Sequence, residues 1–304
     1  MMGTAPIRTT LESLNRRHLK FAGLSVLLVV VLHRTFATWL QLAWHNEEYT
    51  FLWMIPLISA GLIYRSRREV FARMDSAPDG MVLIALGVVL CAVAHLLSPR
   101  LGPIASLTVA MLGVQMFSAG LFRLCYGRHA WRGARFAFAF LIFMVPVPEV
   151  VIEKAIEYLQ SGSAVAVEGF FTLLQVPYTR HAMYFVLPGL RIEIAPECSG
   201  IRSSIALLLL VVLVAHFALR SRWRQLLLVA SVIPLVLFKN GLRISTLSLL
   251  AIKVDRGFMT GSLHHQGGFV FFGMTLLAVV AFCKLLQHSE QASPNRQGAE
   301  TVSG

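Results

Sequence analysis

Apolar residues of this chain are gathered into long runs that alternate with short polar stretches. The runs cover residues 21–42, 49–64, 81–97, 104–124, 136–152, 201–219, 226–252 and 269–286. Each is close to the length of about 20 mostly apolar residues that an α-helix needs to cross the hydrocarbon core of a membrane. The pattern predicts an all-α, polytopic membrane protein with about eight transmembrane helices.

Composition agrees with this pattern. The 304 residues are 56% hydrophobic and 14% charged, whereas soluble domains usually carry about 25% charged residues. The net charge of +12 does not indicate a nucleic-acid-binding protein, because the basic residues fall in short clusters between apolar runs. The four cysteines have neither metal-binding nor disulfide spacing, so we expect no metal and no cofactor. They are Cys91, Cys125, Cys198 and Cys283.

Basic residues alternate between the polar connections and thereby predict the topology. Four precede the first apolar run, four follow the second and four follow the fourth, whereas the first and third connections hold none and one. Basic connections stay in the cytoplasm. We therefore expect a protein of the inner membrane with both termini in the cytoplasm and residues 153–200 on the outer side. The expected parts are a cytoplasmic segment 1–20, a transmembrane domain 21–287 and a disordered cytoplasmic tail 288–304.

The long outer connection carries secondary structure of its own. Residues 153–175 show helical spacing of apolar positions, which predicts an interfacial or re-entrant helix. Residues 184–186 and 190–194 flank Pro188-Gly189, and the second of these stretches alternates between apolar and polar residues. This is typical of a β-hairpin. A small extracytoplasmic β-hairpin is therefore expected just before Cys198.

Cys198 stands in a polar stretch, at the start of the apolar run that begins at Ile201. The unpaired N–H groups and the dipole at a helix N-terminus favour a thiolate there. Arg202 adds a positive charge one turn later. The alternative is that Cys198 is a small, inert side chain in an apolar protein.

Charged residues inside an apolar run are costly and often functional, and the seventh run holds Lys239 and Arg243. Arg243 follows Leu226 by 17 residues, or about 26 Å of helix, in a core of about 30 Å. It is therefore expected near the outer boundary, at the level of Cys198. The alternative is that Arg243 only extends its charge to the outer headgroups.

His264 precedes the last apolar run, on the same predicted outer side. A histidine is the usual partner of a catalytic thiol, although an ordinary polar loop would explain it as well. The other histidines on apolar stretches (His33, His95 and His216) are expected to be packed or to face an aqueous lumen.

Three motifs, in this order, resemble those of the exosortase/archaeosortase family of membrane transpeptidases. Residues 197–202 (Glu-Cys-Ser-Gly-Ile-Arg) resemble its nucleophile box, and residues 240–243 (Asn-Gly-Leu-Arg) its Asn-x-x-Arg box. His264, with Gly268 four residues later and two aromatic residues after that, resembles its His box. Supporting similarity at Tyr49, Pro56 and Pro146-Val147-Pro148 extends the resemblance over most of residues 40–275.

The resemblance implies a membrane-embedded cysteine peptidase or transpeptidase that acts on exported proteins through a thioester. Its substrates would carry a C-terminal sorting signal: a short motif such as Pro-Glu-Pro, then an apolar helix, then a basic tail. Whether water, an exopolysaccharide or a lipid accepts the acyl group stays open. The implied partners are such secreted proteins and the lipid bilayer.

The resemblance also implies roles for single residues. Cys198 would be the nucleophile, Arg243 a transition-state stabiliser or substrate clamp, and His264 the acid/base. His265 leaves the last assignment ambiguous by one residue, although the spacing to Gly268 favours His264. The residues expected to bind substrate are Arg202, Lys239 and Asn240.

Two rival functions belong to other classes. A small-solute transporter could bind an anion with Lys239 and Arg243, although the sequence shows no inverted repeat to support it. An assembly factor for polysaccharide export would carry no chemistry of its own.

Overall fold

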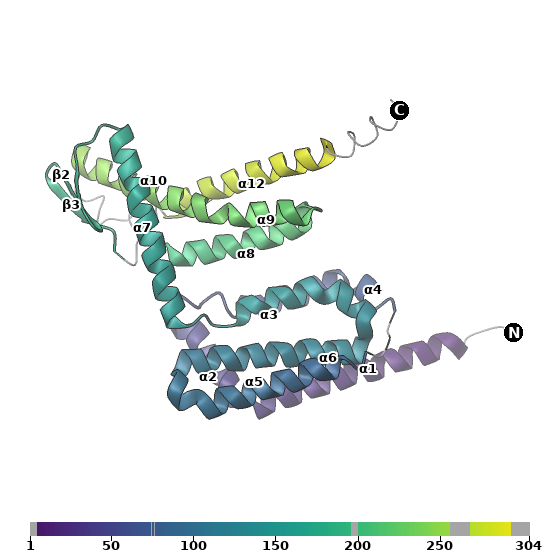
Figure 1. Cartoon of the computed structure of the whole chain (residues 1–304). Helices are drawn as coiled ribbons and strands as arrows, with labels where there is room; N and C mark the ends of the chain where they lie inside the picture. The colour runs from purple at the N-terminus through teal and green to yellow at the C-terminus, as the bar shows by residue number, and fades with distance from the viewer. Residues whose placement is uncertain (1–4, 74, 76, 196–199, 256–267, 293–304) are drawn as a thin grey trace, which may run out of the picture. The chain divides into compact units, whose positions relative to one another are not determined.

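The computed structural model describes residues 5–73, 75, 77–195, 200–255 and 268–292. These residues form two compact units, Met1–Ile152 and Glu153–Gly304, and each unit is described by itself. Helices dominate both units, and one small sheet lies in the second (Figure 1). The predicted all-α class is therefore confirmed.

The first unit consists of helices. Its elements are α1 (Ala5–Val31), α2 (His33–His45), α3 (Met54–Arg65), α4 (Arg67–Val70), α5 (Gly80–Leu101), α6 (Pro103–Phe140), a 3-10 turn η1 (Leu141–Met144) and the start of α7 (Glu149–Leu173).

Helices α5 and α6 approach each other closely because glycines face each other between them. A Cβ atom built on Gly87 would lie 2.6 Å from the carbonyl oxygen of Gly113, and one on Gly80 would lie 2.5 Å from that of Gly120. Small residues that let backbones approach are the usual basis of helix packing in membranes, where burial of apolar side chains gives little driving force. The glycines thus account for the long contact between the two helices.

Helix α6 folds back on itself at Gly127, whose φ of 85° and ψ of −175° are not helical. The Gln115 side chain donates a hydrogen bond to the carbonyl of Phe138 at 2.9 Å. In a straight helix these two residues would be about 35 Å apart, so the arms before and after Gly127 must pack antiparallel. The expected run 104–124 therefore corresponds to the first arm, whereas the run 136–152 begins in the second arm and continues through η1 to the first turn of α7.

Among the described residues, the second unit holds the sheet and five helices. Its elements are most of α7, the strands β1 (Thr179–His181), β2 (Tyr184–Leu187) and β3 (Leu190–Glu193), and the helices α8 (Ile201–Ala218), α9 (Arg222–Ala230), α10 (Val232–Lys253) and α12 (Gly268–Ala292).

The expected hairpin is present and has a further strand. Strands β2 and β3 pair antiparallel with Leu187 opposite Leu190, which leaves Pro188 and Gly189 as a two-residue turn. Gly189 has a φ of 72°, a value that suits glycine in such turns. The additional strand β1 pairs with β2, and the sheet buries Phe185 and Ile192 against Phe171 of α7.

The prediction of about eight membrane spans is wrong. Among the described residues, five helices are long and apolar enough to cross a membrane, or six if the pair α1 and α2, bent by 79°, is counted as one span. Helix α3 has only 12 residues, because the loop before it takes up the first part of the apolar run 49–64. One interrupted helix, Pro103–Met144, also accounts for two expected runs.

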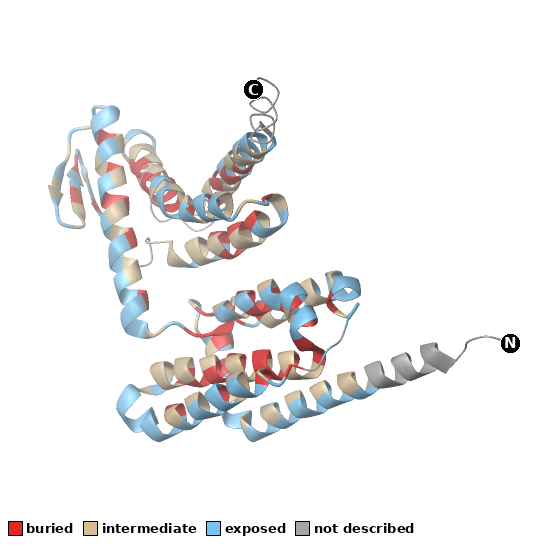
Figure 2. Cartoon of the chain, turned by 45° about the vertical axis from the view of Figure 1, so that its right-hand side comes forward, coloured by how far each residue is buried: buried red, intermediate tan, exposed pale blue. Residues whose placement is uncertain are grey.

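Large apolar side chains cover the outer faces of both units, as a membrane environment requires. Val82 of α5 is 70% exposed and Leu277 of α12 is 71% exposed. Figure 2 shows that buried residues lie on the inner sides of the helices, with exposed residues along the outer sides of α5 and α12. Soluble proteins rarely expose so much contiguous apolar surface, so the chain is a multi-pass membrane protein.

Candidate active site

The residues assigned to catalysis fall partly outside the described residues. Cys198 lies in the gap 196–199, and His264 and His265 lie in the gap 256–267. Arg202, Lys239, Asn240 and Arg243 are described, and all four belong to the second unit. The structure therefore describes the framework around the expected nucleophile and histidine.

The first and second motifs meet at Gly200. This residue caps α8 in the left-handed conformation, with φ 72° and ψ 24°. A Cβ atom built on it would lie 2.8 Å from Oδ1 and 2.9 Å from Nδ2 of Asn240, a residue that is completely buried. Glycine is thus required at this position for two reasons. The backbone conformation is left-handed, and the amide of Asn240 leaves no room for a side chain.

A second polar contact joins α10 to the start of α8. The ammonium group of Lys239, a residue only 6% exposed, donates a hydrogen bond to the hydroxyl of Ser203 at 2.6 Å. The Ser203 hydroxyl in turn donates to the carbonyl of Gly200 at 2.9 Å. Burial of an unpaired charge would be costly, so this short chain of hydrogen bonds stabilises both Lys239 and the first turn of α8.

Arg243 follows Lys239 by one helical turn and therefore lies on the same side of α10. The residue is half-buried, and its Nε is buried without a hydrogen-bond partner among the described residues. Buried guanidinium nitrogens normally have acceptors. This part of the site can therefore receive an oxygen acceptor from a bound molecule. Arg202, in the first turn of α8, is exposed and adds a further positive charge.

Helix α7 packs closely against the part of α10 that carries the second motif, a contact that the sequence analysis missed. A Cβ atom on Gly241 would lie 2.5 Å from the Cβ of Ala166, and one on Gly162 would lie 2.7 Å from a methyl of Leu237. Ser163 is completely buried in the same stretch. The run of small residues from Gly162 to Ala166 is the signal that could have predicted this close packing.

The chain that leads toward Cys198 is held in place at Ile194. Its N–H donates to the carbonyl of Met183 at 3.0 Å, and its carbonyl accepts a hydrogen bond from the Gln160 side chain of α7 at 2.9 Å. Ile194 is also buried against the sheet. Described contacts thus fix the chain on both sides of the gap, at Ile194 through α7 and at Gly200 beside Asn240.

Gly268, the described residue of the third motif, lies at the start of α12. At the far end of α8, the Gln287 side chain of α12 donates to the carbonyl of Ala218 at 3.0 Å, and Glu290 accepts the N–H of Ser221 at 2.6 Å. Near the beginning of α12, Phe272 packs against the apolar cluster that Ile201 of α8 also contacts. Helices α8 and α12 thus run in the same direction, and Gly268 lies toward the end where Gly200 meets Asn240.

The positions of supporting similarity in the first unit also contact one another. Tyr49, which is 2% exposed, donates its hydroxyl proton to the carbonyl of Val147 at 2.7 Å. Burial, with smaller contributions from the charges of Glu48 and Glu149, raises the pKa of Tyr49 to about 12. The Pro146 carbonyl accepts a hydrogen bond from Thr108 at 2.8 Å, so the Pro-Val-Pro stretch is tied to the helices around it.

Metal-binding side chains do not gather at any point in the described part of the chain. Among these residues, no group of three or more His, Cys, Asp or Glu side chains could hold a metal ion.

Comparison with known proteins agrees with the motifs. The sequence model of the family described as Transmembrane exosortase (Exosortase_EpsH) matches residues 39–281, a range that includes all three motifs. No curated protein and no solved structure matches the chain. With two of the motifs in contact in a helical membrane unit, and with this match over most of its length, the chain belongs to the transmembrane exosortase family, whose general role is that of a membrane transpeptidase.

Proposed function

We propose that this exosortase is a cysteine transpeptidase that cleaves C-terminal sorting signals from exported proteins, with Cys198 as nucleophile. Arg243 would stabilise the transition state or clamp the substrate, and His264 would act as acid and base. The observation that carries the proposal is the contact of Gly200 with Asn240. It brings the nucleophile motif and the arginine motif together although they lie 40 residues apart.

Chain connectivity supports the same grouping. Cys198 precedes Gly200 by two residues and His264 precedes Gly268 by four. An extended chain spans about 3.3–3.6 Å per residue, so the Cα of Cys198 can lie no more than about 7 Å from that of Gly200, and the Cα of His264 no more than about 14 Å from that of Gly268. These limits support the proposal that all three residues belong to one site.

The reaction follows from the chemistry of these side chains. The Cys198 thiolate attacks the scissile carbonyl, and the negative charge that develops on its oxygen is stabilised by the guanidinium of Arg243. His264 donates a proton to the leaving amine as the C–N bond breaks, which leaves a thioester on Cys198. The neutral imidazole then takes a proton from the acceptor, water or another nucleophile, as it attacks the thioester. The acyl group leaves with the acceptor and the thiolate is restored.

The substrate class follows from the family and from the lipid-facing helices. A sorting signal with an apolar helix can enter the membrane beside the exposed faces of the enzyme, and a basic tail would hold it with one end in the cytoplasm. The motif before that helix would then reach the extracytoplasmic side of the inner membrane, where we propose that Cys198 lies. A membrane-impermeant thiol reagent on intact spheroplasts should therefore label Cys198.

Co-expression with a secreted protein that carries such a C-terminal signal tests the proposal, with the mass of its C-terminus as the measurement. Cys198→Ala should abolish processing, whereas Cys283→Ala, which changes a cysteine buried in the apolar cluster of the second unit, should preserve it. Arg243→Lys should lose most processing, because an ammonium cannot replace a planar guanidinium at a carboxylate or oxyanion. Normal processing by Cys198→Ala would reject the proposal and favour a transporter or an assembly factor.

A further inference from the structure

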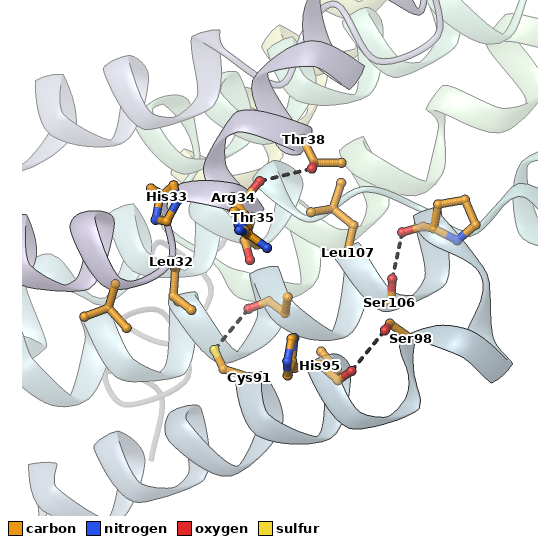
Figure 3. Close-up of a pocket in the computed structure, with 14 residues that line it drawn as sticks. Leu32, His33, Arg34, Thr35, Thr38, Cys91, His95, Ser98, Ser106 and Leu107 are labelled. Carbon is orange, nitrogen blue, oxygen red and sulfur yellow. Dashed lines mark hydrogen bonds between the residues drawn. The ribbon is translucent and has the colours of Figure 1, made fainter.

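The first unit contains an opening that the proposed reaction does not use. It lies where α1 ends and α2 begins, at Leu32, and it has a volume of about 480 Å³. The second half of α5 and the start of α6 form the opposite wall (Figure 3). Breaks in membrane helices are tolerated where they line a cavity. The 79° bend between α1 and α2 is therefore consistent with its position at this opening.

The polar side chains of this opening favour an anion. Arg34 and Thr35 of α2 and His95 of α5 all line it (Figure 3). The lining contains no acidic residue, and in the described part of the first unit Arg34 makes neither an ion pair nor a side-chain hydrogen bond. A guanidinium with an imidazole and hydroxyl groups nearby is a set of donors that suits a phosphate.

Other polar groups around the opening are already satisfied. The hydroxyls of Ser98 and Ser106 donate to the carbonyls of His95 and Pro103, and the hydroxyl of Thr38 donates to the carbonyl of Arg34. His33, which also lines the opening, has its Nδ1 at 3.0 Å from the carbonyl oxygen of Val30. The donors left for a ligand are therefore concentrated in the side chains of Arg34, Thr35 and His95.

An apolar cavity of about 240 Å³ adjoins this opening and shares Val31, Leu32 and Cys91 with it. The rest of its lining comes from Leu24, Leu27, Leu28, Gly87, Val88 and Phe117. The polar opening lies toward Gly102, where α5 ends and α6 begins, whereas Gly87 is 15 residues deeper along α5, or about 22 Å. The lining thus changes from polar to apolar from the end of the helices toward their middle.

This gradient matches the orientation of a membrane lipid, with its headgroup at the interface and its chain in the hydrocarbon core. A free anion would use the polar opening only, and a neutral lipid would leave Arg34 without a counterion. We propose that the first unit binds an anionic phosphate-bearing lipid, with the phosphate at Arg34, Thr35 and His95 and one hydrocarbon chain in the adjoining apolar cavity.

Native mass spectrometry of the full-length protein tests this proposal, with phosphatidylglycerol as the probe and phosphatidylcholine as the neutral comparison. The wild type should retain one phosphatidylglycerol and prefer it to phosphatidylcholine. Arg34→Gln should weaken retention about tenfold, as expected for loss of a charge-assisted contact at an accessible site. The matched control is Arg100→Gln, an exposed arginine of α5 outside the lining, which should bind like the wild type.

Two further arms separate a lipid from a free anion. Val88→Trp should fill part of the apolar cavity and weaken retention, whereas Val82→Trp, at an exposed position of α5 outside that lining, should not. An excess of inorganic phosphate should leave the bound phosphatidylglycerol in place. The proposal would be overturned if inorganic phosphate displaced the lipid or if both lipids were retained equally. It would also be overturned if Arg34→Gln bound phosphatidylglycerol as well as Arg100→Gln does, or if Val88→Trp left retention unchanged. Gel filtration and circular dichroism of each variant verify that it is folded.

Discussion

The two units of this exosortase pack their helices in similar ways and use polar residues in opposite ways. In the first unit, glycines bring α5 and α6 together, and the polar side chains of Arg34 and His95 line an open space. In the second unit, Gly241 packs against Ala166, and polar side chains are buried and engaged with the backbone cap of α8. The first arrangement suits reversible binding, and the second suits chemistry that needs fixed geometry.

The difference has a physical reason. A buried ammonium group is costly unless it finds a partner, so the hydrogen bond from Lys239 to Ser203 holds the start of α8 in one position. An open pocket places no such demand on Arg34, because water or a lipid headgroup can solvate it. Four sets of substitutions test this contrast between the units, in order of decreasing effect.

The greatest loss is expected at the proposed acid/base residue. His264→Ala should lower the processing rate about 10²–10⁴-fold, the usual contribution of a general acid or base. His265→Ala should keep most of the activity, because neighbouring side chains on a helix point about 100° apart. The measurement is the rate of substrate cleavage in membranes with equal amounts of enzyme. If His265→Ala were inactive and His264→Ala active, His265 would be the acid/base residue and the assignment of the third motif would be wrong by one residue.

The next effect distinguishes the glycines of the two units. Gly200→Ala should destabilise the protein by about 2 kcal/mol, since alanine is strained in the left-handed region and its Cβ would press on Asn240. It should also slow processing, because the cap of α8 lies two residues from Cys198. Gly87→Ala, which would separate α5 from α6, should destabilise by about 1–3 kcal/mol and preserve the rate per folded molecule.

Thermal unfolding in detergent and cleavage rates measure these two quantities separately. Gly169→Ala and Gly23→Ala are the matched controls in the two units, because a Cβ at either position meets nothing within 4 Å. Equal loss of rate by Gly200→Ala and Gly87→Ala would mean that the cap of α8 has no special role in the reaction.

An effect of comparable size on stability tests the buried contact between Lys239 and Ser203. Ser203→Ala should destabilise the protein by about 1–3 kcal/mol, because it leaves a buried ammonium without its acceptor. The double variant Lys239→Met with Ser203→Ala should recover much of that loss, since an apolar pair of similar volume removes the need for an acceptor. Thermal unfolding of both single variants and the double variant completes the cycle. Additive losses would show that the two side chains do not interact.

The weakest effect belongs to a partly exposed ion pair of the first unit. The hydrogen bond from Arg123, with a further one from Arg128, holds the pKa of Asp79 below its usual value. A lowered pKa means that the pair stabilises the folded state at neutral pH and that this stabilisation is lost as the pH falls through the pKa of Asp79. Asp79→Asn should therefore slightly lower the Tm at pH 7, and the difference from wild type should shrink as the pH falls through the pKa of Asp79. A pH-independent difference would contradict an ionic origin.

Local residue patterns were enough to locate several of the membrane segments. The expected runs 201–219 and 269–286 coincide closely with α8 and α12, because transfer of apolar side chains into lipid is a local property that composition records. The hairpin around Pro188-Gly189 was predictable for a similar reason, since a two-residue turn depends on its own residues and on alternation beside it. The family was likewise indicated by three short motifs, each of which is a local arrangement of residue types.

The way in which these segments meet depends on tertiary contacts. The reversal of α6 at Gly127, the packing of α7 against Gly241 and the bend at Leu32 depend on contacts between residues far apart in the chain. Gly200 and Asn240 lie 40 residues apart in the sequence, and their contact follows from the packing of α8 against α10. Such contacts are set by close packing and by the need to satisfy buried polar groups, which no local pattern of hydrophobicity records.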